Sequence, residues 1–170
     1  MSAPGSDARR LIDALGLEAH PEGGWFREAF RSPERIDRTG LPARFPTARW
    51  LATSILYLLA AGERSCFHRL RADELWCHHA GGAMHLHLLE RGASRTLVVG
   101  GDTPQASVPH GTWFAAEPAP GAAWALVGCF VSPGFEYEDF ELADRERLLA
   151  EFPGERERVM RFTRSNGARS

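Results

Sequence analysis

Residues 62–81 read GERSCFHRLRADELWCHHAG. Two alternating runs in this stretch, Ser65–Leu70 and Glu74–His79, flank a polar turn at residues 71–73 and predict two short strands. Residues two apart in a strand share a face. The strands then present two faces, one formed by Cys66, His68 and Leu70 and the other by Glu74, Trp76 and His78. If the turn forms a hairpin, His68 and Glu74 meet across it.

An imidazole beside a carboxylate on rigid strands has three chemical uses. It binds a metal ion, transfers a proton or holds a polar ligand. The alternative is a buried polar pair that only satisfies its own hydrogen bonds, as buried polar groups must. The spacing alone leaves both interpretations open.

The spacing of this stretch resembles the first signature of the cupin superfamily, G-x5-H-x-H-x3-E-x6-G. Gly62, His68, Glu74 and Gly81 fall in place, whereas Leu70 stands where the signature has its second histidine. The second cupin signature, around P-x-G-x2-H, resembles residues 109–114, with Phe114 at the histidine position. The resemblance therefore implies a cupin that keeps two of the four usual metal ligands. It also favours a functional role for His68 and Glu74, on rigid strands that face a pocket.

Other segments are similar to one small branch of cupins. His20-Pro21-Glu22-Gly23-Gly24 resembles the opening motif of a functionally uncharacterised branch related in fold to the dTDP-sugar epimerases. Further pieces of the same resemblance follow in order: Trp76, Gln105, Trp113 and residues 126–135. The resemblance extends from about residue 10 to about residue 152, nearly the whole of a single domain.

The composition is that of an ordinary globular protein. The chain has 170 residues, 44% hydrophobic and 25% charged, with a formal charge of −2, which predicts one domain with its own core. No basic stripe supports a nucleic-acid or membrane-surface partner, and no apolar run reaches the ~18 residues of a membrane span. Three cysteines without zinc-motif spacing and the lack of an apolar leader predict a cytoplasmic protein with reduced thiols.

Many short strands separated by glycine and proline turns predict an all-β fold. The expected fold is a single cupin, a jelly-roll-like double-stranded β-helix barrel, over residues 6–162, with a short helix near each terminus. Residues 1–5 and 163–170 are expected to be disordered. The helices are expected at 7–15 and 145–152, and the strands at 25–31, 50–60, 65–70, 74–79, 83–90, 94–99, 105–108, 112–116, 124–131 and 136–141.

The apolar residues at two ligand positions argue against a metal ion. A catalytic metal usually has three or more protein ligands, and Leu70 and Phe114 remove two by resemblance. We therefore expect no cofactor. The alternative is a divalent transition metal held by His68, Glu74 and His78, with the thiolate of Cys66 as a further ligand.

The ligand-binding residues are expected around the same pair. Trp76 and Phe114 would form aromatic walls, and the remaining candidates are Leu70, His78, Cys66 and Gln105, with Glu22 and Arg27 as weaker ones. A nucleophilic Cys66 beside His68 is disfavoured, because free cysteines are more often small buried apolar residues. We interpret His20 as structural and place His85 and His87 on the solvent face of their strand. His110 is expected near the barrel mouth.

The function expected from these residues is binding of a small molecule inside the barrel. The ligand classes are carbohydrates, nucleotide sugars and other polar or partly aromatic molecules. If the protein is an enzyme, resemblance to the sugar epimerases implies a metal-independent isomerase or epimerase with His68 and Glu74 as acid–base groups. The alternatives are a metal-dependent oxygenase or isomerase, and a non-catalytic sensor or storage module. Resemblance also implies a homodimer.

Overall fold

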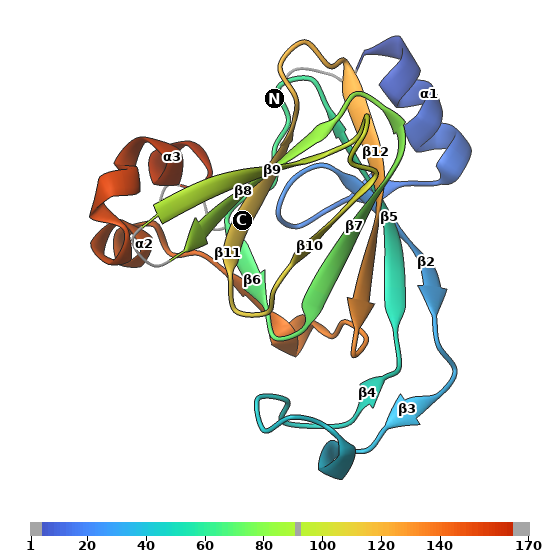
Figure 1. Cartoon of the computed structure of the whole chain (residues 1–170). Coiled ribbons are helices and arrows are strands. Elements are labelled where there is room, and N and C mark those ends of the chain that lie inside the picture. The colour runs from blue at the N-terminus through green and yellow to red at the C-terminus, as the bar shows by residue number, and fades with distance from the viewer. Residues whose placement is uncertain (1–4, 91–92, 165–170) are drawn as a thin grey trace.

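Two antiparallel sheets face each other without closing into a continuous barrel (Figure 1). The computed structural model describes residues 5–90 and 93–164. The six-stranded sheet has the order β1-β2-β5-β12-β7-β10 and the five-stranded sheet the order β13-β6-β11-β8-β9. The six-stranded sheet comprises β1 (Glu18–Ala19), β2 (Trp25–Arg31), β5 (Thr53–Ala60), β7 (Asp73–Gly81), β10 (Gln105–Val108) and β12 (Trp124–Ser132). The five-stranded sheet comprises β6 (His68–Leu70), β8 (Met84–Glu90), β9 (Ala93–Val99), β11 (Trp113–Pro118) and β13 (Phe140–Leu142).

The main core fills the space between the two sheets. Alternate residues of β8, Met84, Leu86 and Leu88, are fully buried there and belong to one cluster with Trp76 and Tyr57 from the opposite sheet. Their neighbours on β8 point to the other face, as the period-two pattern requires. The predicted all-β, two-sheet architecture is confirmed.

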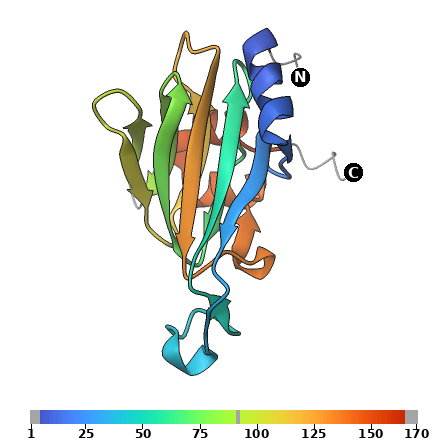
Figure 2. The ribbon, with the colours of Figure 1, turned by 90° about the vertical axis from the view of Figure 1, so that its right-hand side faces the viewer.

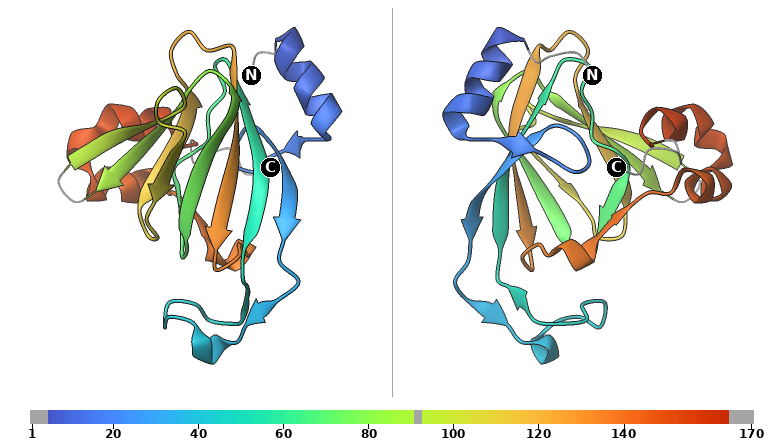
Figure 3. Two further views of the ribbon diagram at one scale, coloured as in Figure 1. Left: turned by 45° about the vertical axis from the view of Figure 1, so that its right-hand side comes forward. Right: turned by 180° about the vertical axis from the view of Figure 1, so that it is seen from behind.

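Helices cover the outer faces of both sheets. α1 (Ser6–Leu15) lies along the six-stranded sheet, where Ile12 packs in one cluster with Leu58 (Figure 2). α2 (Arg145–Glu151) and α3 (Arg156–Arg161) pack on the five-stranded sheet, with Leu148 and Val159 in a cluster around Trp113 (Figure 3). The predicted terminal helices are confirmed, and the capping side chain of Asp144 accepts a hydrogen bond from the Arg147 amide at 2.9 Å. α3 was not predicted.

The strands that carry His68 and Glu74 do not form a hairpin. β6 pairs with β11 and β13, whereas β7 pairs with β12 and β10 in the other sheet. The short turn at residues 71–72 therefore carries the chain from one sheet to the other. A turn signal does not say whether the next strand pairs with its predecessor, so the local pattern could not distinguish the two cases. His68 and Glu74 consequently face each other from opposite sheets.

Two other predicted strands are divided in the structure. The run predicted at 50–60 breaks after Trp50, which belongs to β4 (Arg49–Trp50), before β5 begins at Thr53. β4 pairs only with β3 (Arg35–Ile36). The run predicted at 136–141 begins with a 3-10 turn, η2 (Tyr137–Asp139), before β13. Both breaks occur where the chain leaves a sheet. An alternating pattern of apolar residues does not predict such a position.

Residues 32–52 form an arm that projects from one end of the sheets (Figure 3). The arm includes β3, β4 and the 3-10 turn η1 (Arg38–Gly40). The fully buried guanidinium of Arg49 anchors it, with Nε 2.6 Å from Asp139 Oδ2 and Nη2 2.8 Å from Asp139 Oδ1. A bidentate pair of this kind fixes geometry as well as charge. The arm is thereby tied to η2.

The chain remains packed close to the C-terminal end of the described residues. Thr163 is buried and its hydroxyl donates to the Val159 carbonyl at 2.6 Å, within the stretch 163–170 for which we expected disorder. Residues 1–4 and 165–170, the rest of the segments expected to be disordered, lie outside the described residues. None of the helices in the described ranges has the length and apolar character needed to cross a membrane.

Breaking the anchor of the arm should destabilise the fold. Asp139→Asn removes the charge of the bidentate partner, so that the buried Arg49 is left with the half-exposed Glu138, whose Oε1 lies 2.8 Å from its Nη2. We expect the free energy of unfolding to fall by about 3 kcal/mol, the lower end of the range for broken buried ion pairs. Glu90→Gln is the matched control, because Glu90 and Arg95 form an exposed pair worth less than ~1 kcal/mol. Urea unfolding of both variants measures the difference. Equal losses would contradict the anchoring role.

Candidate functional site

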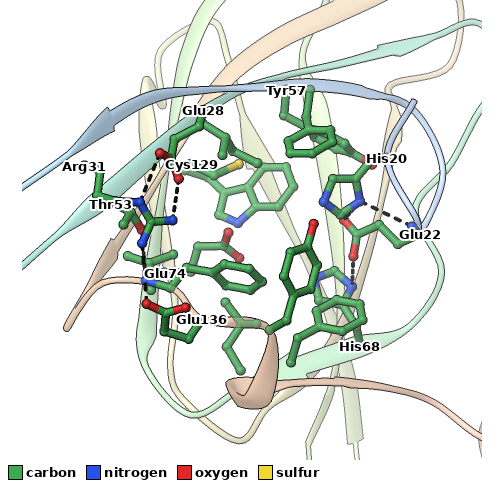
Figure 4. Close-up of a pocket in the computed structure, with 18 residues that line it drawn as sticks. His20, Glu22, Glu28, Arg31, Thr53, Tyr57, His68, Glu74, Cys129 and Glu136 are labelled. Carbon is green, nitrogen blue, oxygen red and sulfur yellow. Dashed lines mark hydrogen bonds and ion pairs between the residues drawn. The ribbon is translucent and has the colours of Figure 1, made fainter. Parts of the chain in front are cut away.

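A cavity of about 110 Å³ opens between the two sheets (Figure 4). Its walls come from β2, β5, β6, β7 and β12, together with the loop before β2 and the segment 135–140. The lining is mainly aromatic and aliphatic but carries, in addition to Glu74, six histidine, glutamate and arginine side chains: His20, Glu22, Glu28, Arg31, His68 and Glu136. A concave, largely apolar pocket with a few convergent polar groups is the usual form of a small-molecule site.

The His20–Gly24 turn carries Glu22 into the cavity. Gly23 and Gly24 have φ angles of 114° and 77°, which glycine adopts without strain. A Cβ on Gly23 would also lie 2.3 Å from the Arg64 carbonyl oxygen. The Tyr57 hydroxyl donates to the Gly23 carbonyl at 2.6 Å and fixes the turn against β5. The backbone conformation of this turn therefore explains why glycine occupies both positions.

His68 is paired with Glu22. Its Nδ1 lies 2.9 Å from Glu22 Oε2 and 2.8 Å from the Cys66 carbonyl oxygen. Both neighbours are acceptors, so Nδ1 carries the proton and Nε2 is the nitrogen left to act on a ligand. Burial alone would lower the pKa of His68, but the carboxylate of Glu22 outweighs it, and the pKa lies above the ordinary value of 6.5.

Glu74 faces His68 from the other sheet in a nearly dry environment. Its side chain is 7% exposed, and Oε2 has no hydrogen-bond partner among the described residues. Burial raises the pKa of Glu74 to about 7, although the positive charge of His68 opposes the shift. Groups with such shifted pKa values in a cleft are typical of functional sites. Glu74 therefore changes its protonation state near neutral pH.

An ion-pair cluster stands at the other end of the cavity. Arg31 Nη2 lies 2.6 Å from Glu28 Oε2, and Nη1 lies 3.5 Å from Glu136 Oε1 (Figure 4). The single arginine of the lining is thus already occupied by two carboxylates. The cavity as a whole has an excess of acidic groups.

The structure brings most of the central predicted residues together. His68, Glu74, Trp76 and Leu70 line the cavity, as expected from the two strand faces. Phe114 does not line it but packs behind His68, with ring centroids 4.1 Å apart. Because β11 pairs with β6, Phe114 supports the imidazole and is not itself a wall.

Three predicted ligand-binding residues lie elsewhere. His78 is two residues beyond Trp76 along β7, past the cavity, and its Nε2 lies 3.1 Å from the Gly82 carbonyl oxygen. Gln105 is exposed on the edge strand β10. Cys66 precedes β6 and contributes its carbonyl oxygen to His68. Burial raises the pKa of the Cys66 thiol, which disfavours a thiolate nucleophile or ligand.

The remaining histidines separate clearly. His20 has the structural role predicted at the turn, because its Nδ1 accepts a hydrogen bond from the Glu22 amide at 3.3 Å. Its side chain also lines the cavity, which was not predicted. His87 lies on the outer face of β8, with Nε2 3.0 Å from Glu117 Oε1. The prediction that His87 faces solvent is wrong, because its ring is buried against Phe162, 4.8 Å between ring centroids. His110 is exposed and bonded to Asp73. Glu22 itself was only a weak candidate, and the HPEGG motif was its signal.

The residues present do not fit a metal ion with three protein ligands. The predicted set of His68, Glu74 and His78 is not brought together, because His78 lies beyond the cavity. Within residues 5–90 and 93–164, no group of three or more His, Cys, Asp or Glu side chains has suitable geometry. Leu70 occupies part of the cavity wall where the cupin signature has a histidine.

Residues 9–143 match a family model described as "Cupin superfamily (DUF985)". The chain belongs to the cupin superfamily. No curated protein matches it. This cupin is 37% identical to a protein of Shewanella oneidensis, with a TM-score of 0.82 over 97% of this chain and 100% of that one. A hypothetical protein from Leishmania major is 30% identical, with a TM-score of 0.82 over 93% and 99% of the two chains.

Two larger proteins share the fold at lower identity. Oxalate decarboxylase from Bacillus subtilis is 17% identical, with a TM-score of 0.52 over 85% of this chain and 36% of that one. The capsular polysaccharide assembling protein CapF from Staphylococcus aureus is 14% identical, with a TM-score of 0.55 over 75% and 31%. These likenesses concern the fold alone.

The raised pKa of Glu74 should appear in the stability of the protein. An acid with a folded-state pKa above its unfolded value retains its proton longer in the native state, so stability falls as pH rises from about 4.5 to about 7. At ~1.4 kcal/mol per pKa unit, ionisation of the buried Glu74 lowers the free energy of unfolding by about 3 kcal/mol above pH 7. We therefore expect Glu74→Gln to stabilise the protein at pH 8 relative to wild type, with little gain at pH 4.5. Thermal unfolding at both pH values measures this, and an equal gain at both would contradict it.

Proposed function

We propose that this cupin binds a small molecule in its cavity and transfers a proton to and from it, as in an isomerase or epimerase that needs no metal ion. The observation that carries the proposal is the buried Glu22–His68 pair, which faces Glu74 across the cavity. Two titratable groups in one cavity, each with a pKa shifted by its own environment, are a usual arrangement for acid–base catalysis.

His68 is the group proposed to exchange a proton with the ligand. Its Nδ1–H is directed to Glu22 and to the Cys66 carbonyl, so Nε2 accepts the proton from the ligand. Glu22 keeps the ring in this tautomer and stabilises the imidazolium that forms, the role that a buried carboxylate has beside a catalytic histidine. Glu22 is accordingly a positioning residue.

The charges of the lining favour an uncharged ligand portion in the cavity. Four carboxyl groups, those of Glu22, Glu28, Glu74 and Glu136, surround the space, and Arg31 is already paired. Burying a phosphate beside these carboxyl groups would be strongly unfavourable, because Arg31 is not free to neutralise it. Of the ligand classes expected from the sequence, a compact carbohydrate or similar hydroxy-carbonyl compound fits best. A nucleotide sugar would have to leave its phosphates outside.

Proton transfer can be measured without knowing the physiological substrate. In D₂O, the protein should catalyse exchange of the C–H protons beside the carbonyl group of small uncharged probes: dihydroxyacetone, glyceraldehyde and cyclopentanone. We expect His68→Gln to reduce the exchange rate by ~10²-fold or more, the usual contribution of a general base. Proton NMR follows the loss of the C–H signal.

Two variants provide the controls, one at Glu22 beside His68 and one at the exposed His79. Glu22→Gln should also slow exchange and shift its pH dependence to lower pH, because the carboxylate that raises the pKa of His68 is lost. His79→Gln should leave the rate unchanged, since His79 is exposed and does not line the cavity. Binding of the probes without any exchange would instead indicate the sensor or storage alternative.

The metal-dependent alternative has a separate test. We expect elemental analysis of protein purified without added metal to find no stoichiometric transition metal, and exchange to survive dialysis against EDTA. The double variant Leu70→His, Phe114→His restores the two missing histidines of the cupin signatures beside His68 and should gain affinity for divalent transition metals. Stoichiometric metal in the wild type, with loss of exchange after EDTA, would overturn the metal-free proposal.

A further inference from the structure

The residues that follow α3 contact two segments that are far apart in the sequence. The Phe162 carbonyl oxygen accepts a hydrogen bond from the Phe67 amide at 2.8 Å. Two residues later, the Arg164 guanidinium donates to the Pro21 carbonyl oxygen. The short segment 162–164 therefore joins the chain at residue 21 to the chain at residue 67.

These two segments carry the two partners of the buried Glu22–His68 pair. Glu22 directly follows Pro21 in the turn before β2. His68 directly follows Phe67 and begins β6. The segments also contact each other, because the Cys66 amide donates to the Glu22 carbonyl oxygen at 3.0 Å. The 2.9 Å contact between the two side chains (Figure 4) therefore depends on how these backbones are held together.

The segment 162–164 is itself packed against the rest of the protein. Phe162 is 1% exposed, and its ring lies against that of Phe67 with centroids 5.7 Å apart. Thr163 is buried, and its hydroxyl accepts a hydrogen bond from Arg145 Nε at 2.8 Å. Chain ends are poorly ordered unless contacts of this kind hold them. The segment therefore gives the residue that follows Thr163 a fixed support.

α3, from which the segment extends, is attached to the five-stranded sheet by a buried polar cluster. Arg158 Nη1 lies 3.0 Å from His87 Nδ1, and His87 Nε2 lies 3.0 Å from Glu117 Oε1. A guanidinium can only donate, so Nδ1 accepts from Arg158 and Nε2 donates its proton to Glu117. Arg161, one turn after Arg158, pairs with the same carboxylate. This cluster, which the proposed chemistry does not use, fixes the position of α3.

We propose that segment 162–164 holds the turn that carries Glu22 against the residues before β6, and that Arg164 is a positioning residue for the Glu22–His68 pair. The inference rests on the proposed function and adds to it a residue outside the cavity. Arg164 does not line the cavity and lies beyond residues 9–143, which match the family model. Its effect on a ligand therefore passes through the pair.

The contacts of the turn show what the loss of Arg164 would change. Three successive carbonyl oxygens in the turn each accept a hydrogen bond: Pro21 from Arg164, Glu22 from Cys66 and Gly23 from Tyr57. Tyr57 belongs to the six-stranded sheet, whereas the other two donors lie on the side of His68. Without Arg164, a single backbone hydrogen bond among the described residues would join the turn to the segment before β6. Functional geometry tolerates displacements of only about 0.5 Å, so a small shift of the turn would lengthen the contact between Glu22 and His68.

The simpler interpretation is a surface contact that only adds to stability. Arg164 is exposed, and substitutions of surface residues usually change stability little. A stabilising contact alters only the fraction of folded molecules. A positioning contact alters the rate of proton transfer and the Glu22–His68 hydrogen bond within the folded protein.

Exchange of the C–H protons of dihydroxyacetone in D₂O separates the two interpretations. We expect Arg164→Ala to lower kcat about fivefold, the value of about one hydrogen bond, and to leave KM unchanged because Arg164 does not line the cavity. Arg164→Lys keeps a donor and should recover most of the rate. Arg95→Ala is the matched control, because it removes an exposed arginine that pairs with Glu90. Equal effects of the two alanine substitutions, with both variants shown to be folded by thermal unfolding, would overturn the proposal.

Proton NMR of the whole protein reports the Glu22–His68 contact directly. The Nδ1 proton of His68 lies between Glu22 and the Cys66 carbonyl oxygen and should resonate far downfield, because hydrogen bonds to carboxylates are short and strong. His68→Gln assigns the signal by removing it. In Arg164→Ala we expect the signal to move upfield, toward its position in Glu22→Gln, as the hydrogen bond lengthens. An unchanged signal in Arg164→Ala would overturn the positioning role.

The two measurements separate a failure of this inference from a failure of the proposed function. Exchange that requires His68 but is unaffected by Arg164→Ala would refute the role of Arg164 and leave the proposed function intact. An upfield shift of the Nδ1 signal in Arg164→Ala, without any exchange by the wild type, would support the role of Arg164 and refute the proposed catalysis.

Discussion

The contact between Glu22 and His68 is the interaction on which the site depends. It joins the loop before β2, which leads into the six-stranded sheet, to the first residue of β6 in the five-stranded sheet. Both side chains are nearly inaccessible to solvent. Removing one partner would leave a buried charge or a buried imidazole without compensation, which is far costlier than replacing both. The turn formed by the HPEGG motif therefore changes the direction of the chain and also places the Glu22 carboxylate in the site.

The surroundings of this contact are apolar, and that explains the behaviour of the titratable groups. Phe114 and Phe140 contact the His68 ring, and Trp76 borders Glu74. Low polarity strengthens the interaction between His68 and Glu22 and at the same time disfavours the ionised form of Glu74. One environment thus raises the pKa of His68, which makes its neutral form a stronger base, and raises the pKa of Glu74, whose carboxyl group keeps its own proton to higher pH. The two apolar residues at the signature's histidine positions contribute to this environment.

The fold was largely predictable from the sequence, because alternating apolar residues define strands wherever one face is buried. Met84, Leu86 and Leu88 illustrate this, since every one is in the core. The site was predictable in part. His68 and Glu74 were predicted from the cupin-like spacing of one segment, and Trp76 from the strand face that it shares with Glu74. The expected hairpin was wrong, and the partner of His68 was not predicted as such, because Glu22 reaches it only through the packing of the two sheets. The sequence also does not show how far the cavity extends along β7. His78 was therefore predicted as a site residue, although it lies beyond the end of the cavity.

The crossing of the chain between β6 and β7 has a consequence for specificity. His68 and Glu74 stand on different sheets. The distance between them therefore depends on the separation of the sheets, which the volume of the core side chains determines. Side chains such as Leu88, which lie in the core and do not line the cavity, contribute to that spacing through their volume. Homologous chains could therefore come to accept longer or shorter molecules by exchanging interior aliphatic residues for larger or smaller ones, while every polar group of the site stays the same.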